Sequence, residues 1–270
     1  MNCSPGIHGQ AGTMHGGCGC NCGCGSKKRT GQEGGKKGEL SSSGRFHPVV
    51  GVYMITETLM ELVLKRYGLN FEAGDCVMLS AGPYAQARPY SIASGIHDDH
   101  LRFLIRLVPE GQVTSFLKAL KPGDTVFVSA PFGWFHPGVG LDAPFAFVAT
   151  GTGIAPFLSY CRSYPERAPE YCLYGVRHLH DAWGADELAR KTRLMLAVSR
   201  EKRADVFYGR VTDLIPQIEL QTGMHFFLCG LDTMIDEVAD RLEARGVPAA
   251  NIHWEVFFHA QPNQNEANCS

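Results

Sequence analysis

Short apolar runs separated by turn residues characterise the chain from about residue 45 to about residue 140. The runs cover residues 49–55, 59–64, 76–79, 101–108 and 125–128. Between them stand Gly74-Asp75, Asp98-Asp99 and Pro122-Gly123-Asp124. Strand-length runs at regular spacing with turn residues between them are typical of all-β folds. The pattern predicts an antiparallel β-barrel or sandwich over residues 45–140.

After residue 140 the pattern changes to alternating strands and helices. Strands are predicted at residues 146–149, 171–175, 194–198, 226–229 and 252–257, and helices at about residues 157–161, 185–190, 212–218 and 233–244. The last helix has an apolar face that includes Met234 and Val238, and Gly246 with Pro248 ends it. Strict alternation predicts an α/β domain over residues 141–258, with a parallel sheet and helices on both of its faces.

The two ends of the chain differ from these regions. Residues 1–44 are rich in Gly and Ser and have almost no large apolar side chain, so they cannot bury enough surface to offset their ordering entropy. We expect a disordered N-terminal tail, and a polar C-terminal tail over residues 259–270.

The N-terminal tail places four thiols within seven residues, at Cys18, Cys20, Cys22 and Cys24. Glycine spacers would let such a loop wrap a soft ion such as zinc or copper(I). The spacing is not that of a common zinc site or of an iron-sulfur protein. A flexible tail with redox-labile thiols is the preferred interpretation, and a metal site is the alternative.

Composition argues against several classes of protein. The formal net charge is −2 over 270 residues, so no basic field points to nucleic acid. No apolar run approaches the ~20 residues needed to cross a bilayer, and the start lacks the apolar core of a secretory signal. Six of the ten cysteines lie in the tails, and we expect a reducing cytoplasm as the compartment.

Residues 88–91, Arg-Pro-Tyr-Ser, lie near the middle of the predicted barrel. In an extended segment Arg88 and Tyr90 point to one side. A guanidinium can grip a pyrophosphate through paired hydrogen bonds, and a phenol ring can stack on a flat heterocycle. A flavin dinucleotide has both parts. Taken alone, the motif is better explained as an ordinary edge strand with a solvated Arg88 and a packed Tyr90.

Two further stretches have the pattern of anion-binding segments. In residues 111–115, Gly-Gln-Val-Thr-Ser, we expect Thr114 or Ser115 to cap a short helix whose free amides bind phosphate. A capped helix between two strands is the alternative. In residues 150–156, Thr-Gly-Thr-Gly-Ile-Ala-Pro, a strand leads through a glycine loop into a helix, and Pro156 suits its first turn. Such a loop lets backbone amides approach a pyrophosphate.

Ligands of a parallel α/β sheet bind beyond the carboxyl ends of its strands. Those ends carry residues 150–153, 175–177, 199–200 and 229–230 and the residues after Trp254. Ser199 and Arg200 suit the 2′-phosphate of NADP, whereas an acidic residue there would suit NAD. An exposed strand end in a basic segment is the alternative.

The order of these motifs resembles the ferredoxin-NADP reductase family of flavoproteins over about residues 45–258. The resemblance rests on residues 88–91, 111–114 and 151–156, on Cys229-Gly230 with Met234, and on Glu255-Val256-Phe257. It implies FAD as cofactor and NADP, with NAD as the alternative, as the nicotinamide nucleotide. The implied catalytic residues are Ser91, Cys229 and Glu255. The implied cofactor-binding residues are Arg88, Pro89, Tyr90, Ser91, Gly111, Val113, Thr114, Gly151, Thr152, Gly153, Pro156, Arg177, Ser199, Arg200, Cys229 and Phe257.

Within this resemblance Arg88 would bind the FAD pyrophosphate, Tyr90 would stack on the isoalloxazine, and Ser91 would lie near its reactive nitrogen. Strict alternation points Ser91 away from Tyr90, so its role requires the strand to twist or end there. The sequence departs from the family pattern at Asp75 and Leu231. The polar residues after His259 also leave the flavin-shielding aromatic residue unassigned.

Three functional hypotheses follow. The leading one is an FAD-dependent NAD(P)H oxidoreductase that passes electrons between a nicotinamide cofactor and a one-electron protein acceptor such as ferredoxin or flavodoxin. The second is an NADH-dependent reductase subunit of an oxygenase or other multi-component complex. The third is a metal-binding or docking protein that keeps a flavin fold as scaffold. The cysteine spacing matches no iron-sulfur motif, so we expect the one-electron centre on an iron-sulfur or flavodoxin-type partner.

Overall fold

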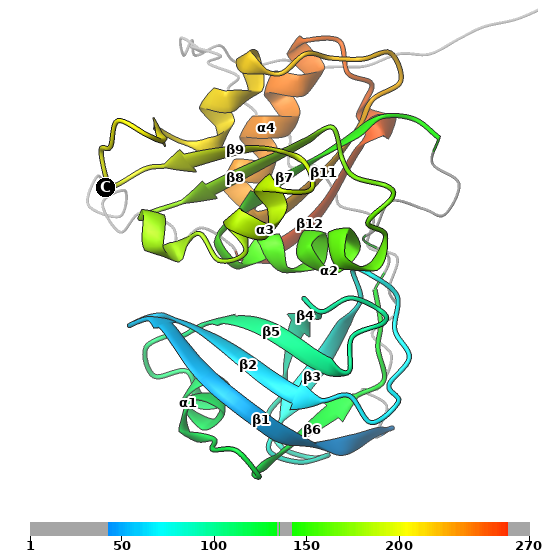
Figure 1. Cartoon of the computed structure of the whole chain (residues 1–270), viewed down its shortest axis with the longest axis vertical. Helices are drawn as coiled ribbons and strands as arrows, with labels where there is room; N and C mark the ends of the chain where they lie inside the picture. The colour runs from blue at the N-terminus through cyan, green and yellow to red at the C-terminus, as the bar shows by residue number, and fades with distance from the viewer. Residues whose placement is uncertain (1–42, 134, 136–141, 259–270) are drawn as a thin grey trace, which may run out of the picture. The chain divides into compact units, whose positions relative to one another are not determined.

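The computed structural model describes residues 43–133, 135 and 142–258 of the chain. Six strands of its first half form one antiparallel sheet (Figure 1). These strands are β1 Gly44–Thr56, β2 Leu59–Lys65, β3 Cys76–Ser80, β4 Arg88–Ser91, β5 His100–Arg106 and β6 Thr125–Ser129. Their order is β4-β3-β6-β1-β2-β5. Beyond the end of β4 the Ala93 N–H donates to the Arg102 carbonyl of β5 at 2.8 Å, which brings the two edges of the sheet together. The prediction of an antiparallel barrel is confirmed.

Helix α1, Gln112–Ala119, corrects one detail of the prediction. Gly111 is the N-cap residue, and neither Thr114 nor Ser115 caps the helix. Thr114 lies inside the first turn, where its hydroxyl donates back to the Gly111 carbonyl at 3.1 Å. The helix therefore begins at the backbone of Gly111, whose carbonyl accepts the Ser115 N–H at 2.9 Å, and no hydroxyl caps it.

The second half is a six-stranded parallel sheet with the order β10-β9-β8-β7-β11-β12. Its strands are β7 Phe145–Thr150, β8 Tyr171–Val176, β9 Arg193–Val198, β10 Phe207–Tyr208, β11 His225–Leu231 and β12 Ile252–Phe258. The chain runs outward from β7 to β10 and then returns to β11 on the other side of β7. The switch point, where such sheets bind ligands, therefore lies at the carboxyl ends of β7 and β11.

Helices cover both faces of this sheet, as predicted (Figure 1). They are α2 Ala155–Ser163, α3 Ala185–Ala189 and α4 Asp232–Ala244, with 3-10 helices η1 Gly151–Ile154, η2 Leu179–Asp181, η3 Val211–Gln217 and η4 Ala249–Asn251. Alternate residues of β7 enter opposite cores: Phe147 stacks on Phe157 of α2 at 4.1 Å, while Val148 packs in the core that contains Val238 of α4. The segment expected as a helix at 212–218 is the 3-10 helix η3, because Pro216 inside it cannot donate an α-helical hydrogen bond.

One face of α2 bonds to the chain segment that follows β4. Ser159 Oγ donates to the Ser94 carbonyl at 2.7 Å, and the Ile96 N–H donates to Ser163 Oγ at 3.0 Å. Between these two serines Arg162 Nη1 donates to the Ala93 carbonyl at 2.7 Å. Positions three and four apart lie on one helix face, so the three side chains reach the same stretch of backbone.

The longest helix among the described residues is α4, with 13 residues, and none of the described helices has the length and apolar character of a membrane span.

A half-buried histidine pair predicts that the stability of the fold depends on pH. His225 Nδ1 and His253 Nε2 lie 3.0 Å apart, and the His253 ring stacks on Phe227 at 4.7 Å. Burial, followed by the charge of His225, lowers the pKa of His253 from its ordinary value of 6.5. A histidine with a lowered folded-state pKa takes up a proton on unfolding, so the free energy of unfolding falls as the pH drops below about 6.5.

We expect His253→Phe, which keeps an aromatic ring beside Phe227, to lose less stability between pH 7.5 and pH 5.5 than the wild-type chain does. Urea unfolding at several pH values measures the difference. Equal pH dependence in the two proteins would exclude a contribution from this pair.

Candidate functional site

Strand β4 holds the Arg-Pro-Tyr-Ser motif at the edge of the barrel sheet. The Arg88 side chain is exposed, and its Nη1 donates to the carbonyl of Ala87 at 3.0 Å. Tyr90 is half-buried, and burial raises the pKa of its phenol to about 12, so the ring is uncharged at neutral pH. Ser91 is buried at the last position of β4. The strand ends at this residue, which permits Ser91 to line the same pocket as Arg88 and Tyr90.

A pocket of about 580 Å³ contains these three side chains. Residues of both halves of the chain line it. They are Cys76, Gln86, Arg88, Pro89, Tyr90, Ser91, Leu104, Arg106, Val108, Gly111, Gln112, Val113, Thr114, Phe132, Thr152, Ala155, Glu255, Val256 and Phe257. The structure thus brings together the residues expected from the flavin strand, the start of α1, the glycine loop and the end of β12.

A chain of polar contacts crosses the floor of this pocket. Ser91 Oγ lies 3.1 Å from Cys76 Sγ, and the Cys76 thiol donates to Glu255 Oε1 at 3.9 Å. Glu255 Oε2 is buried and has no hydrogen-bond partner among the described residues. Burial raises the pKa of Glu255 to about 7, and the hydrogen bond from Cys76 acts in the opposite direction. A carboxyl group with a pKa near neutral pH is therefore linked to Ser91 through the Cys76 thiol.

Helix α1 offers backbone donors to the same pocket. Its first intrahelical hydrogen bond is from the Ser115 N–H to the Gly111 carbonyl, so the amides of residues 112–114 precede the bonded turns. A Cβ atom on Gly111 would lie 2.6 Å from Thr114 Oγ1, so a side chain there would displace the threonine. The start of the helix is thus suited to an anion.

The glycine loop after β7 is the 3-10 helix η1, which is packed tightly against β11. A Cβ atom on Gly153 would lie 2.3 Å from the Cys229 carbonyl oxygen, so only glycine fits at this position. Tyr174 Oη donates to the Gly151 carbonyl at 3.1 Å from the adjacent strand. The Leu231 N–H donates to Thr150 Oγ1 at 3.2 Å, which joins the ends of β11 and β7. These contacts hold the loop at the switch point of the sheet.

Several predicted residues lie outside the pocket. Cys229 is the register partner of Glu255 across strands β11 and β12, but it is fully buried and does not line the pocket. Gly151, Gly153 and Pro156 also do not line the pocket, although their neighbours Thr152 and Ala155 do. Cys18, Cys20, Cys22 and Cys24 lie outside the described residues.

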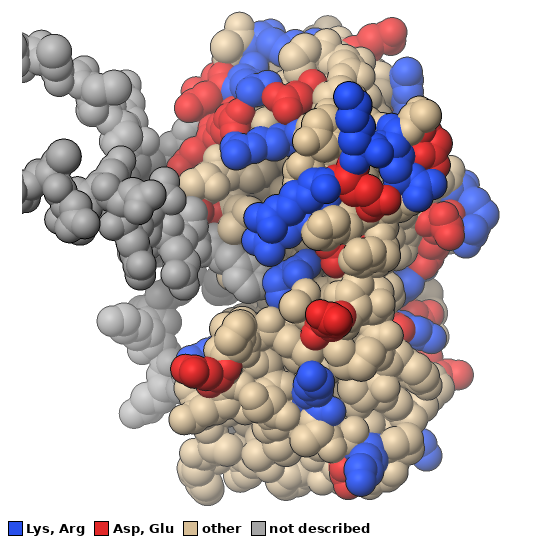
Figure 2. All heavy atoms as spheres, turned by 90° about the vertical axis from the view of Figure 1, so that its left-hand side faces the viewer, with Lys and Arg blue, Asp and Glu red and all other residues tan. Residues whose placement is uncertain are grey.

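The predicted 2′-phosphate residues form a separate edge at the carboxyl ends of β8 and β9. The Arg200 N–H donates to the Arg177 carbonyl at 2.9 Å, so two exposed arginines are neighbours through their backbones. Ser199 beside them donates its hydroxyl to the Val176 carbonyl at 3.3 Å. Lys and Arg side chains gather over the α/β half on the face shown in Figure 2.

The sequence interpretation did not assign several polar residues that line the pocket, among them Cys76 and Arg106. Cys76 stands in an apolar run, where a free cysteine usually packs as a small hydrophobic residue. Its contact with Ser91 depends on the antiparallel register of β3 and β4, which pairs the two residues. Arg106 ends β5, donates to Thr58 Oγ1 at 3.2 Å, and lies near the glycine loop, since its Nη2 is 3.8 Å from a Cβ built on Gly151. The sequence of β5 indicates that the strand ends in a polar residue. It does not indicate that this residue, Arg106, lies beside the glycine loop.

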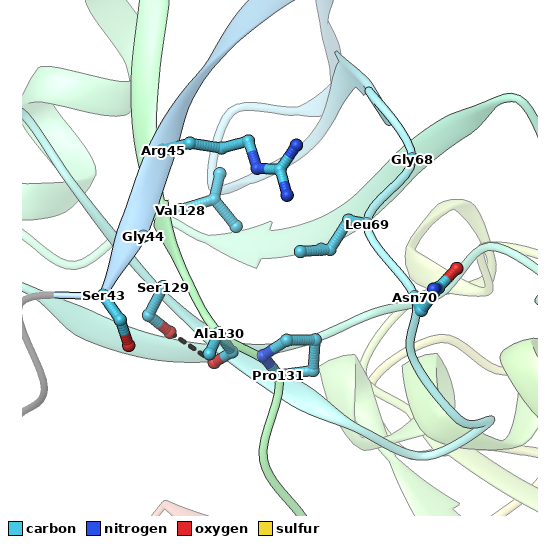
Figure 3. A pocket seen from close by; sticks show the side chains of 10 residues that line it. All are labelled: Ser43, Gly44, Arg45, Gly68, Leu69, Asn70, Val128, Ser129, Ala130 and Pro131. Carbon is cyan, nitrogen blue, oxygen red and sulfur yellow. Dashed lines mark hydrogen bonds between the residues drawn. The ribbon is translucent and has the colours of Figure 1, made fainter.

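Another pocket, of about 360 Å³, lies between the start of β1, residues 68–70 and the end of β6 (Figure 3). Arg45 reaches across it toward the 68–70 loop and donates to the Tyr67 carbonyl at 3.0 Å. It contains none of the predicted site residues.

Comparison with known proteins agrees with this architecture. The family described as "Oxidoreductase FAD-binding domain" matches residues 56–136, and the family described as "Oxidoreductase NAD-binding domain" matches residues 147–240. Ferredoxin–NADP reductase B of Sorangium cellulosum is 32% identical over 234 residues, which cover 77% of this chain and 96% of that protein.

Other relatives are longer. The toluate 1,2-dioxygenase electron transfer component of Pseudomonas putida is 32% identical over 223 residues, covering 77% of this chain and 66% of the relative. The chain spans 61% of the length of the reductase component of the naphthalene 1,2-dioxygenase system from the same species, at 28% identity. A ferredoxin NADP+ reductase from Neisseria gonorrhoeae, solved with bound FAD and NADP, shares the fold with a TM-score of 0.73 at 21% identity, covering 80% of this chain and 99% of that one.

Fold and family matches define a flavoprotein oxidoreductase with an FAD-binding and an NAD(P)-binding half. The chain belongs to the ferredoxin–NADP reductase family. Its pocket fits the flavin cofactor: an uncharged aromatic ring, an exposed guanidinium and the amides at the start of a helix all line one cavity. The close approach of Gly153 to β11 likewise fits a loop that receives a pyrophosphate.

The contact between Cys76 and Glu255 leads to a prediction about protonation. Since the thiol donates to the charged carboxylate, Cys76→Ala should raise the pKa of Glu255 further above about 7. NMR titration of ¹³C-labelled Glu carboxyl carbons follows this group, and Glu255→Gln assigns its signal.

Cys161→Ala is the matched control, because Cys161 is also a buried thiol whose pKa burial raises to about 12, but it lies on α2. An unchanged or lowered pKa of Glu255 in Cys76→Ala would show that the thiol does not stabilise the carboxylate.

Proposed function

We propose that the protein is an FAD-dependent NAD(P)H oxidoreductase that passes electrons between a nicotinamide cofactor and a one-electron protein acceptor, such as ferredoxin or flavodoxin. The observation that carries this proposal is the shared pocket. Tyr90 and Ser91 from the barrel face the same cavity as Thr152, Glu255 and Phe257 from the carboxyl edge of the parallel sheet. A flavin and a nicotinamide must meet at close range, and a cavity lined by both halves provides that proximity.

The flavin is proposed to bind to the half formed by residues 45–140. Arg88 is assigned to its pyrophosphate, with Gly111, Val113 and Thr114 adding donors at the start of α1. Tyr90 and Pro89 are assigned to the isoalloxazine, and Phe257 is placed to exclude water from its other face. Exposure of the Arg88 guanidinium and half-burial of the Tyr90 ring support these roles.

The nicotinamide nucleotide is proposed to bind along the carboxyl edge of residues 141–258. Gly151, Thr152, Gly153 and Pro156 are assigned to the pyrophosphate side of the nucleotide. The neighbouring strand ends, at Arg177, Ser199 and Arg200, are assigned to the 2′-phosphate. The backbone hydrogen bond between Arg177 and Arg200 supports this assignment, because it places two cations together.

The bound flavin would supply hydride and single-electron chemistry, while the protein positions groups and holds protons. Glu255 can hold or release a proton near neutral pH, since burial raises its pKa to about 7. Cys76 contacts both this carboxyl group and Ser91. Cys229 lies on the neighbouring strand β11, where it is the register partner of Glu255. Ser91 and Glu255 are therefore our proposed catalytic residues, and Cys229, predicted as a third, is proposed to act with them by positioning Glu255.

An NADH-dependent reductase component of an oxygenase is the second candidate. It is favoured by the toluate and naphthalene dioxygenase components of Pseudomonas putida, which match this chain over 61% to 66% of their own length. The preferred nicotinamide cofactor separates the two candidates in part. A preference for NADPH favours the first candidate, because Arg177 and Arg200 suit the 2′-phosphate of NADP, and a preference for NADH favours the second.

We propose the cytoplasm as the compartment. Cys76, Cys161, Cys172 and Cys229 are buried free thiols, which agrees with a reducing environment.

Arg88→Ala should weaken FAD binding by about tenfold or more, because it removes the charge-assisted hydrogen bonds proposed for the pyrophosphate. The flavin content of the purified variant and titration of the apoprotein with FAD measure the effect. Arg45→Ala is the control, since Arg45 is an arginine of the same barrel in the other pocket. Wild-type FAD affinity in Arg88→Ala would contradict the assigned role.

Arg200→Ala should weaken NADPH binding by about tenfold or more and leave NADH binding unchanged, because only NADPH carries the 2′-phosphate. Anaerobic bleaching of the bound flavin by each nucleotide, recorded over a range of concentrations, gives both affinities. Arg203→Ala is the matched control: Arg203 lies three residues away and is paired with Asp205 at 3.0 Å. A loss with neither nucleotide, or an equal loss with both, would refute this role of Arg200.

A further inference from the structure

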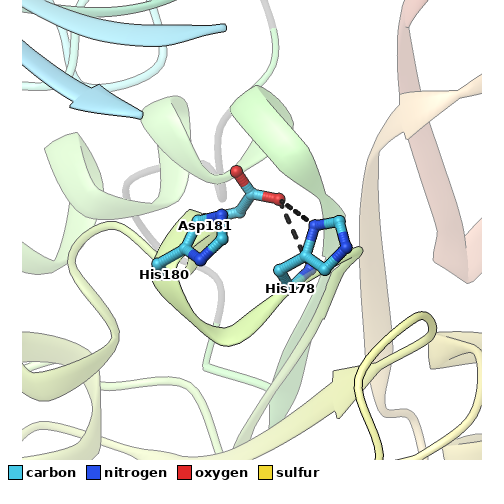
Figure 4. A group of neighbouring side chains, drawn as sticks. All are labelled: His178, His180 and Asp181. Atoms are coloured by element: carbon cyan, nitrogen blue, oxygen red, sulfur yellow. Dashed lines mark hydrogen bonds and ion pairs between the residues drawn. The ribbon is translucent and has the colours of Figure 1, made fainter. Parts of the chain in front are cut away.

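Three side chains with metal-binding atoms meet just after β8, outside the proposed electron-transfer site. They are His178, His180 and Asp181, and their ligand atoms all lie within 4.8 Å of one another. Figure 4 shows the three side chains gathered at the turn formed by η2. None of them lines the proposed flavin pocket.

One pair in this cluster is already close to coordination spacing. Asp181 Oδ2 lies 3.7 Å from His178 Nδ1 and also accepts the His178 backbone N–H at 3.4 Å. Two ligands of a tetrahedral zinc ion, with bonds of about 2.1 Å, lie about 3.4 Å apart. The aspartate is only 5% exposed, so the fold holds this carboxylate in place.

The third group is free to adjust. His180 is exposed, and its ring stacks on the His178 ring with centroids 5.3 Å apart and planes 15° apart. Among the described residues, no hydrogen bond to another side chain fixes the His180 ring. Rotation about its side-chain bonds can shorten the 4.8 Å spread by the ångström or so that coordination requires.

A second carboxylate borders the cluster. Glu201 Oε2 accepts the Leu179 N–H at 3.0 Å, and Leu179 lies between the two histidines in the chain. The other oxygen of this carboxylate, Oε1, lies 3.6 Å from Arg203 Nη1, so Glu201 is shared with an arginine. Imidazole suits zinc, copper and nickel, whereas magnesium and calcium prefer oxygen ligands alone.

We propose that His178, His180 and Asp181 form a binding site for a divalent transition ion of the zinc class. Water or the Glu201 carboxylate completes the coordination. The site belongs to the α/β half and uses none of the tail cysteines as ligands. It lies directly after Arg177, at the edge of the sheet assigned to the nucleotide phosphate.

The test uses the full chain with serine in place of the tail cysteines, so that thiolates there do not bind the probe. The replaced residues are Cys3, Cys18, Cys20, Cys22, Cys24 and Cys269. Equilibrium dialysis against Zn²⁺ gives the stoichiometry and affinity. The visible spectrum with Co²⁺ reports the ligands, and we expect d–d bands without a thiolate charge-transfer band.

We expect one zinc ion per chain at micromolar free zinc, with binding at least tenfold weaker in His180→Ala. Asp181→Asn should weaken binding too, while its amide oxygen can still accept the His178 N–H. His97→Ala is the control, because it removes an exposed histidine elsewhere on the chain. The proposal is overturned if no zinc binds at about 100 µM, or if His180→Ala binds as tightly as the His97→Ala control. Thermal unfolding checks that each variant is folded.

Discussion

The hydrogen bonds of Arg162 are the constraint on which the rest of the proposed site depends. Its guanidinium binds the Ala93 carbonyl, two residues beyond the flavin strand, and the Glu187 carboxylate of α3 at 2.7 Å. The same helix α2 begins at the glycine loop, so a single rigid element holds the end of β4 and the start of the nucleotide site. A hydrophobic cluster already joins the two halves, because Leu59, Ala93 and Leu104 of the barrel half pack in one core with residues of α2 such as Ala155 and Leu158. The polar face of α2 adds directional hydrogen bonds to this packing.

Inside that pocket, desolvation is the main electrostatic effect. Burial raises the pKa of Tyr90, Cys76 and Glu255 alike, so the pocket favours neutral groups. A flat, largely apolar ring system fits such a lining, and the exposed Arg88 adds a positive charge to it. Glu255 differs from the other two because its shifted pKa falls near neutral pH. With the roles that we propose, phosphate binding at Arg88 would be separate from proton exchange at Glu255.

The carboxyl edge of the parallel sheet combines features general to such folds with features particular to this chain. The general feature is the switch point between β7 and β11, which the strand order creates. The particular feature is the glycine loop at this point, where Gly153 packs tightly against Cys229. At the neighbouring strand end, the basic Arg177 and Arg200 stand beside the histidines of η2. Phosphate and metal chemistry would therefore meet along one edge, and each would alter the local charge that the other encounters.

Much of the architecture could be read from the sequence because it depends on local periodicity. Short apolar runs separated by turn residues before residue 140, and alternating strands and helices after it, specify the two sheets. Residues 88–91 and 150–156 have recognisable binding chemistry in the sequence itself. The contacts that depend on register could not be read. Cys76 faces Ser91 only because β3 and β4 pair antiparallel at that offset, and it meets Glu255 across 179 positions of sequence. Local pattern determines which elements form, whereas long-range packing decides which side chains meet.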